Sequence, residues 1–207
     1  WIAVVPDKSL YVLGGIRRAS HHQRIEFPIT LPKTPVIITN AQKEGIALLS
    51  CAVDNARNGF CVALRDHNNR PITDAWLLWL AVIPSSENGF KGAVRRYNDG
   101  ANISFSPPLT SWPAYVLSAQ KEWEPYIAGA VENRKNGFYL SLIGHNGSAG
   151  YNVWTQWLGF AGVQVARWHP YSNRYAVIVM GGPASGQLYE WYWQDTYGMY
   201  QELRCLG

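Results

Sequence analysis

Residues 47–66 read ALLSCAVDNARNGFCVALRD and contain the clearest structural pattern of the chain. Two runs rich in Ala, Val and Leu flank the polar segment DNARNG at residues 54–59. Apolar runs separated by a short segment that ends in Asn-Gly are typical of two antiparallel strands joined by a tight turn. The turn exit falls on Asn58-Gly59, where a positive φ is needed. We therefore expect a β-hairpin here.

The hairpin pattern occurs again 78 residues later, as PYIAGAVENRKNGFYLSLIG at residues 125–144. With that shift, residues 25–84 align with 103–162 without a gap, and 20 of the 60 positions are identical. Among the identities are the segment AQKE at 41–44 and 119–122, and the pairs Trp76 with Trp154 and Trp79 with Trp157. Unrelated sequences match at roughly one position in twenty, so the alignment predicts a duplicated unit.

The same shift sets the expected domain bounds. WIAVVP at residues 1–6 matches WLAVIP at 79–84, so residues 1–15 are expected to be the closing strand of a preceding unit and a linker. Residues 16–84 and 94–163 form the two repeats, and 164–207 an incomplete third unit or a C-terminal β segment. That last part contains YEWYWQDTYGMY at 189–200. We expect this segment to form either a strand pair or a contact surface for another subunit or a glycan. Because the chain begins with Trp1, we expect it to be processed or part of a longer protein.

The remaining segments also favour strands. IEFPITL, TPVIITNA and AWLLWLAVI are short runs rich in β-branched and aromatic residues, separated by Gly, Asn and Pro. No stretch of ten residues has a convincing helical period, and the spacing of about 10–15 residues fits a sandwich of antiparallel strands. In the closing strand, Trp76 and Trp79 have opposite parity, so an inward Trp79 implies an outward Trp76. Trp154 and Trp157 repeat this arrangement.

Composition excludes several classes of function. Only 15% of residues are charged, the net charge is +4 and the pI is about 9.0, with Lys and Arg scattered along the chain, which argues against a nucleic-acid partner. No apolar run approaches the roughly 18 residues of a membrane span. The catalytic and phosphate-binding motifs HExxH, GxSxG and the P-loop are absent. We expect no enzymatic activity and no cofactor.

The histidines and cysteines give no metal-ligand spacing, so no metal site is expected. His21 and His22 would point to opposite faces of a strand. The three cysteines are Cys51, Cys61 and Cys205, and the odd count does not indicate a disulfide framework. Cys51 and Cys61 either face each other across the hairpin or are two buried free thiols.

An ordered set of short motifs resembles the H-type lectin domains, the family of snail agglutinins and of the discoidin C-terminal domain. The set consists of Ile25-Glu26-Phe27, Pro35-Val36, the hairpins Val53 to Phe60 and Val131 to Phe138, His67 and His145, and Trp79-Leu80-Ala81. The resemblance covers about 140 of the 207 residues. It implies an all-β fold of two tandem six-stranded antiparallel β-sandwiches, which commonly form trimers, plus an N-terminal strand and an aromatic-rich β segment at the C-terminus.

The same resemblance implies a site for a galactose or N-acetylgalactosamine residue. In the family, an aromatic–His pair on the loop after the GF strand contacts the sugar, together with an Arg on the strand before the hairpin. Here the His is present in both loops, but the aromatic residue is absent, and the Arg position falls near Ala47 and Pro125. The resemblance therefore supports the family's fold for this chain more strongly than it supports the family's sugar site.

The residues themselves offer candidates for sugar binding, because hydroxyl groups pair with planar amide, imidazole and carboxylate groups beside an aromatic face. These candidates are Asp66, His67, Asn68, Trp76, His145, Asn146, Tyr151 and Trp154. The alternative for the two loops is a polar turn made by the Asn residues. Two sequons, Asn102-Ile103-Ser104 and Asn146-Gly147-Ser148, are candidates for glycosylation in a secreted protein.

Two functions follow as hypotheses. The first is a non-enzymatic, lectin-like carbohydrate-binding domain of a multimeric extracellular or virion protein such as a phage tail fibre, in which repeated weak sites gain by avidity. The second is a structural subunit of a fibre or filament, in which residues 1–6 are lent to a neighbour and join chains head to tail by strand exchange. Both predict a homo-oligomer, a trimer or a filament.

Overall fold

The computed structural model describes residues 11–86, 89–109 and 113–161, followed by the backbones of four short strands. All elements are strands that pair antiparallel, and these parts of the chain contain no helix. The predicted all-β class is confirmed. The four last strands, β13 (Val165–Ala166), β14 (Arg174–Ile178), β15 (Leu188–Tyr192) and β16 (Glu202–Cys205), form one sheet in chain order.

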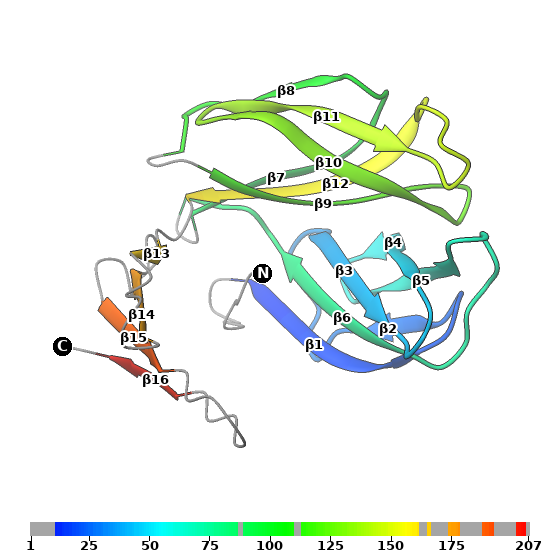
Figure 1. Cartoon of the computed structure of the whole chain (residues 1–207), viewed down its shortest axis with the longest axis horizontal. Coiled ribbons are helices and arrows are strands. Elements are labelled where there is room, and N and C mark those ends of the chain that lie inside the picture. The colour runs from blue at the N-terminus through cyan, green and yellow to red at the C-terminus, as the bar shows by residue number, and fades with distance from the viewer. Residues whose placement is uncertain are drawn as a thin grey trace.

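The first region, residues 11–86, contains two three-stranded sheets (Figure 1). One has the order β1-β6-β3 and the other the order β2-β5-β4. Alternate side chains of these strands point inward and form one apolar core, whose largest buried members include Ile25, Ile37, Phe60, Leu64 and Leu77. The strands are β1 (Val12–Ala19), β2 (Arg24–Glu26), β3 (Val36–Gln42), β4 (Leu48–Ala56), β5 (Gly59–Asp66) and β6 (Ala75–Val82).

The second region, residues 89–161, is one six-stranded sheet with the order β7-β12-β9-β10-β11-β8 that curls around its own core. Phe138, Leu140, Leu142 and Trp157 lie in that core. The strands are β7 (Phe90–Tyr97), β8 (Asn102–Ser104), β9 (Pro113–Lys121), β10 (Glu124–Arg134), β11 (Gly137–Ile143) and β12 (Val153–Ala161).

The second region is not the two-sheet sandwich that was expected, because β9 and β10 pair beside one turn. Glu122 and Trp123 both have positive φ, 52° and 68°, as in the two-residue turns that match strand twist. This turn lets β9 pair with β10 over three positions and joins the two layers into one sheet. At the matching turn of the first region, Lys43 and Ile46 form an isolated bridge only.

The strand bounds and pairings of the two regions correspond at an offset of 78 residues. β1 and β7, like β2 and β8, have bounds that differ by this offset at both ends. β6 pairs with β1 and β3, and β12 pairs with β7 and β9. The aromatic contacts correspond too, because Trp79 packs on Phe27 and Phe60, and Trp157 on Phe105 and Phe138.

The predicted hairpin is present as β4 and β5, with a bulge between Val53 and Ala56. The cysteines do not face each other across it: Cys51 lies opposite Ala63, and Cys61 opposite Val53. Both thiols are free, and only Cys51 is fully buried. The side chain of Cys205 lies outside the described residues.

The expectation for the adjacent histidines was wrong. His21 and His22 lie in the turn after β1 and not on a strand, and His22 has a positive φ of 68°. Their ring centroids are 4.0 Å apart. The polar turn overrides the strand period on which the expectation rested.

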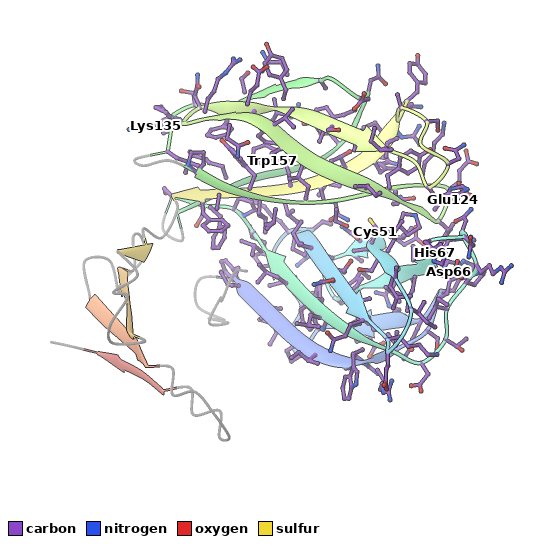
Figure 2. All side chains as sticks on the ribbon, in the orientation of Figure 1. Cys51, Asp66, His67, Glu124, Lys135 and Trp157 are labelled. Carbon is purple, nitrogen blue, oxygen red and sulfur yellow. The ribbon has the colours of Figure 1, made fainter. Side chains whose placement is uncertain are left out.

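The outward faces of β9 and β12 lie against the β3 and β4 side of the first region (Figure 1). An apolar cluster between the regions includes Val12, Val36, Val82 and Leu158. Cys51 lies at this boundary (Figure 2). The described part of the chain is therefore held together by a side-chain contact between the regions as well as by the linker.

Candidate functional site

Two tryptophans point outward at corresponding positions of the two regions. Trp76 on β6 is 43% exposed and Trp154 on β12 is 40% exposed, whereas Trp79 and Trp157 pack inward, as the alternation predicts. The guanidinium of Arg18 lies 4.9 Å from the Trp76 ring centroid, and that of Arg96 lies 5.0 Å from the Trp154 ring centroid. Each arginine is the cross-strand neighbour of its tryptophan.

The other neighbour of each tryptophan comes from the AQKE segment. Trp154 pairs with Gln120, and the ammonium of the adjacent Lys121 donates to the carbonyl oxygen of Tyr151 at 3.3 Å. In the first region, Gln42 pairs with Trp76, and Lys43 donates to the carbonyl oxygen of Thr73 at 2.8 Å. The repeated sequence thus produces the same local structure around both tryptophans.

A pocket of about 270 Å³ adjoins Trp154. Two of its residues, Val53 and Asp54, come from β4 of the first region, and the others come from the second. Asp54 has a φ of 50° because it lies in the bulge of β4. The second region supplies Arg96, Gln120, Lys121, Glu122, Trp123, Asn152 and Trp154.

The pocket combines hydrogen-bonding side chains with an aromatic ring. Asp54 and Glu122 can accept hydrogen bonds, Arg96 and Lys121 can donate them, and the amides of Gln120 and Asn152 can do both. The Trp154 ring supplies an apolar wall. The arrangement can therefore hold a small polyhydroxylated ligand. The Trp76 position has the corresponding arginine, glutamine and lysine.

In the predicted loop at residues 66–68, the polar side chains form hydrogen bonds within the turn. The Asp66 carboxylate accepts the backbone N–H groups of Asn68 and Arg70 at 2.9 and 2.8 Å. The hydrogen bond from Arg70 is the main cause that lowers the pKa of Asp66. His67 and Asn68 contact each other at 3.0 Å between Nε2 and Nδ2. Among the described residues, no hydrogen bond or ring contact joins this loop to Trp76.

The second loop is similar. Asn146 is exposed, and its Oδ1 accepts the backbone N–H of Ser148 at 3.0 Å and its hydroxyl at 2.6 Å. Asn146 therefore stabilises a turn, and His145 beside it is exposed. Of the predicted residues in this region, Tyr151 adjoins the pocket through the Lys121 hydrogen bond to its carbonyl, and Trp154 lines the pocket itself.

Sequence reasoning missed most of the pocket. Asp54, Arg96, Gln120 and Glu122 were not predicted as site residues. The signal was available for three of them, since Arg-Arg and AQKE recur at the offset of 78 residues. The contribution of Asp54 depends on the contact between the regions, which one unit's sequence does not reveal.

The structure also gives the positions of the sequon at Asn102 and of the aromatic segment. Asn102 lies exposed on β8 at the end of the sheet order. The aromatic segment 189–200 contains part of β15, and its side chains lie outside the described residues. No cluster of His, Cys, Asp and Glu in the described part could hold a metal ion. That part also lacks any helix with the length and hydropathy to cross a bilayer.

Comparison with known proteins returns no match: no family model, no curated protein and no solved structure resembles this chain at a significant level. The site is therefore interpreted from its own geometry.

Proposed function

We propose that the chain is a non-enzymatic carbohydrate-binding protein built from two copies of one β unit, and that the pocket at Trp154 is its sugar site. The observation that carries the proposal is the pocket itself, in which one tryptophan wall is surrounded by carboxylate, amide and guanidinium groups. Sugars present an apolar C–H face and bidentate hydroxyl pairs, and this set of side chains matches both.

The tandem layout and the H-type lectin resemblance support the same conclusion. Corresponding strand bounds, pairings and Arg–Trp contacts favour a duplicated six-stranded unit. The resemblance suggests galactose or N-acetylgalactosamine, and a multimer on a cell or virion surface would add avidity. The proposed site differs from the family's, because it lies at the outward tryptophan and not on the histidine loops.

The test is binding of the full chain to a glycan array, followed by calorimetric titration of the best ligand. We expect Trp154→Ala to weaken binding by about tenfold or more, which is roughly 1.4 kcal/mol. Asp54→Asn should weaken binding too, because the Asp54 carboxylate is the polar side chain that the first region contributes to the pocket. His145→Ala is the matched control on the loop and should bind like the wild type. An array without any sugar-dependent signal, or unchanged binding by Trp154→Ala, would overturn the proposal.

A structural role in a fibre is the alternative. Its strand-exchange joint uses residues 1–6, which lie outside the described residues. Deletion of residues 1–6 should abolish assembly if that joint exists.

A further inference from the structure

The contact between the regions has two sides. The docking face consists of the outward side chains Val116, Ser118, Gln156 and Leu158 on β9 and β12. The receiving surface is formed by Ile37 on β3 and by Cys51, Ala52, Val53 and Asn55 on β4.

Gln156 connects the two sides most closely. Its Oε1 accepts the backbone N–H of Ile37 at 2.9 Å and the Asn55 amide at 2.6 Å, and its Nε2 donates to the carbonyl oxygen of Ala52 at 2.9 Å. The side chain therefore bridges the unpaired edges of β3 and β4. Beside it, the Ser118 hydroxyl donates to Cys51 Sγ at 3.0 Å.

The counterpart of the receiving surface is uncovered on β10. Val53 is 6% exposed, but its equivalent Val131 is 48% exposed. Gly129 corresponds to the buried Cys51, and a Cβ built on it would meet no atom within 4 Å. Ile127 is 54% exposed on the same strand. Alternate positions of β10 thus present an apolar strip without a cover in the described part of the chain.

The counterpart of the docking face, on β1, β3 and β6, is also exposed within the part of the chain that the structure describes. Leu78, the equivalent of the buried Gln156, is 37% exposed, and Ile16 on the neighbouring strand is 66% exposed. Asn40, the equivalent of Ser118, is also exposed. Ile38 and Leu80 already pack in the cluster between the regions, so the free part of this face is its other end, toward Trp76.

From these equivalences we propose that a second copy of this chain places its β10 strip, centred on Gly129 and Val131, against the Asn40 and Leu78 face of the first. The contact corresponds to the part of the joint between the regions that Ser118 and Gln156 form. Because the two sides are different surfaces, each copy keeps one free side of each kind, and copies join head to tail.

We call the contact between the two regions the inner contact and the proposed contact between two copies the outer contact. Differences between matching residues of the two contacts agree with the proposal. In the inner contact, Asn69 donates to Glu124 at 2.8 Å, whereas the corresponding outer positions are Gly147 and Ile46. Both members of the hydrogen-bonded pair are therefore replaced at the outer contact, so neither is left without its partner. Leu78 in place of Gln156 makes the outer contact still more apolar. Burial of apolar area, rather than hydrogen bonding, would hold the two copies together.

The second copy would also complete a pocket at Trp76. At Trp154, the first region supplies Val53 and Asp54 from a bulge. Val131 and Glu132 occupy the same bulge in β10, and Glu132 has a φ of 48° against 50° for Asp54. Docking would place this carboxylate beside Trp76 and Arg18 of the other copy. The docking does not depend on what the pocket binds.

The test is disulfide trapping with the full chain, in a Cys61→Ser/Cys205→Ser background. Because Ser118 and Cys51 are 3.0 Å apart in the inner contact, Asn40→Cys and Gly129→Cys should meet in the outer one. We expect a mixture of the two single variants, under a mild oxidant, to form a linked dimer at least fivefold more than either variant alone. Adding Val131→Asp to the Gly129→Cys chain should reduce the dimer to the level of the single variants.

Ser118→Cys is the matched control, since it should close on Cys51 within one chain and show that the chemistry works. If it closes while the mixture gives no excess dimer, the proposal is wrong. Sedimentation velocity gives an independent readout: the average mass of the wild type should rise with concentration, and that of Leu78→Asp should not. A wild type that stays monomeric at the highest soluble concentration would overturn the proposal, and this result would leave sugar binding at Trp154 unaffected.

Discussion

Two glycines at the hairpin turns are required by close backbone approach. A Cβ on Gly59 would collide with the carbonyl oxygen of Ile25, and one on Gly137 would collide with that of Ile103. Gly59 also has a φ of 155°, a conformation that side chains disfavour. The Asn-Gly pairs therefore serve two purposes: they turn the chain, and they let the short strands β2 and β8 pair closely with β5 and β11.

Gly59→Ala should destabilise the protein by roughly 2 kcal/mol or more, because backbone must move to relieve the collision. Gly129→Ala is the matched control, since its Cβ would enter open space on a strand. We expect that control to change the free energy of unfolding by less than about 1 kcal/mol. Urea unfolding monitored by tryptophan fluorescence measures both, and equal stabilities of the two variants would contradict this explanation.

His21 is held neutral by its surroundings. Its Nδ1 accepts the backbone N–H of Leu64 at 3.0 Å, so protonation would break this bond. Burial lowers the pKa of His21 to about 4, and the nearby charges of His22 and Arg65 act in the same direction. The second region has Asp99 at the same position, and its Oδ1 accepts the N–H of Leu142 at 2.7 Å. The position needs an acceptor rather than a histidine.

Stability should therefore fall in mild acid. As the pH falls, the unfolded chain, with a histidine pKa of about 6.5, binds a proton at a higher pH than the folded chain does. The contribution of His21 is complete above pH 6.5 and declines as the pH falls from 6.5 toward 4. His21→Asp keeps an acceptor and should flatten the decline between pH 7 and 5. Urea midpoints at these two pH values test this, and an equal decline in both proteins would refute it.

At the scale of elements, local patterns predicted the structure well. The hairpin of β4 and β5 follows from Asn58-Gly59, and the outward Trp76 and Trp154 follow from strand alternation. The joined sheet of the second region was not predicted, because it depends on the three β9–β10 pairs, where the first region has only the Lys43–Ile46 bridge. The apolar period does not encode how many cross-strand pairs form beside a turn.

The candidate site was predicted only in part for the same reason. Alternation places Trp154 on a surface, and the repeat draws attention to its neighbours. The other wall of the pocket belongs to the bulge at Asp54, 100 residues earlier in the chain. A loop rule pointed instead to His67 and Asn68, whose hydrogen bonds serve the turn itself. Contacts between units determine the site, and they are not local in sequence.

At the scale of the whole molecule, Gln156 makes three of the hydrogen bonds between the two regions, beside an apolar cluster. Gln156 is 3% exposed and satisfies Ile37 N–H and Ala52 C=O, which no strand pairs on that side. Buried backbone groups without partners cost about 1–3 kcal/mol each. The corresponding Leu78 cannot make these bonds.

Gln156→Ala should accordingly lower the stability of the two-region contact by roughly 2 kcal/mol or more, because two backbone groups lose their partners while a cavity opens. Gln120→Ala is the matched control: Gln120 is also a buried glutamine, and its bond to the Trp123 N–H stays within the second region. Urea unfolding and hydrogen exchange of the Ile37 backbone amide provide the readouts. We expect Gln156→Ala to accelerate exchange at Ile37, whereas Gln120→Ala should not. If both variants lose the same stability and leave exchange unchanged, the joint is carried by Val36, Val82 and Leu158 instead.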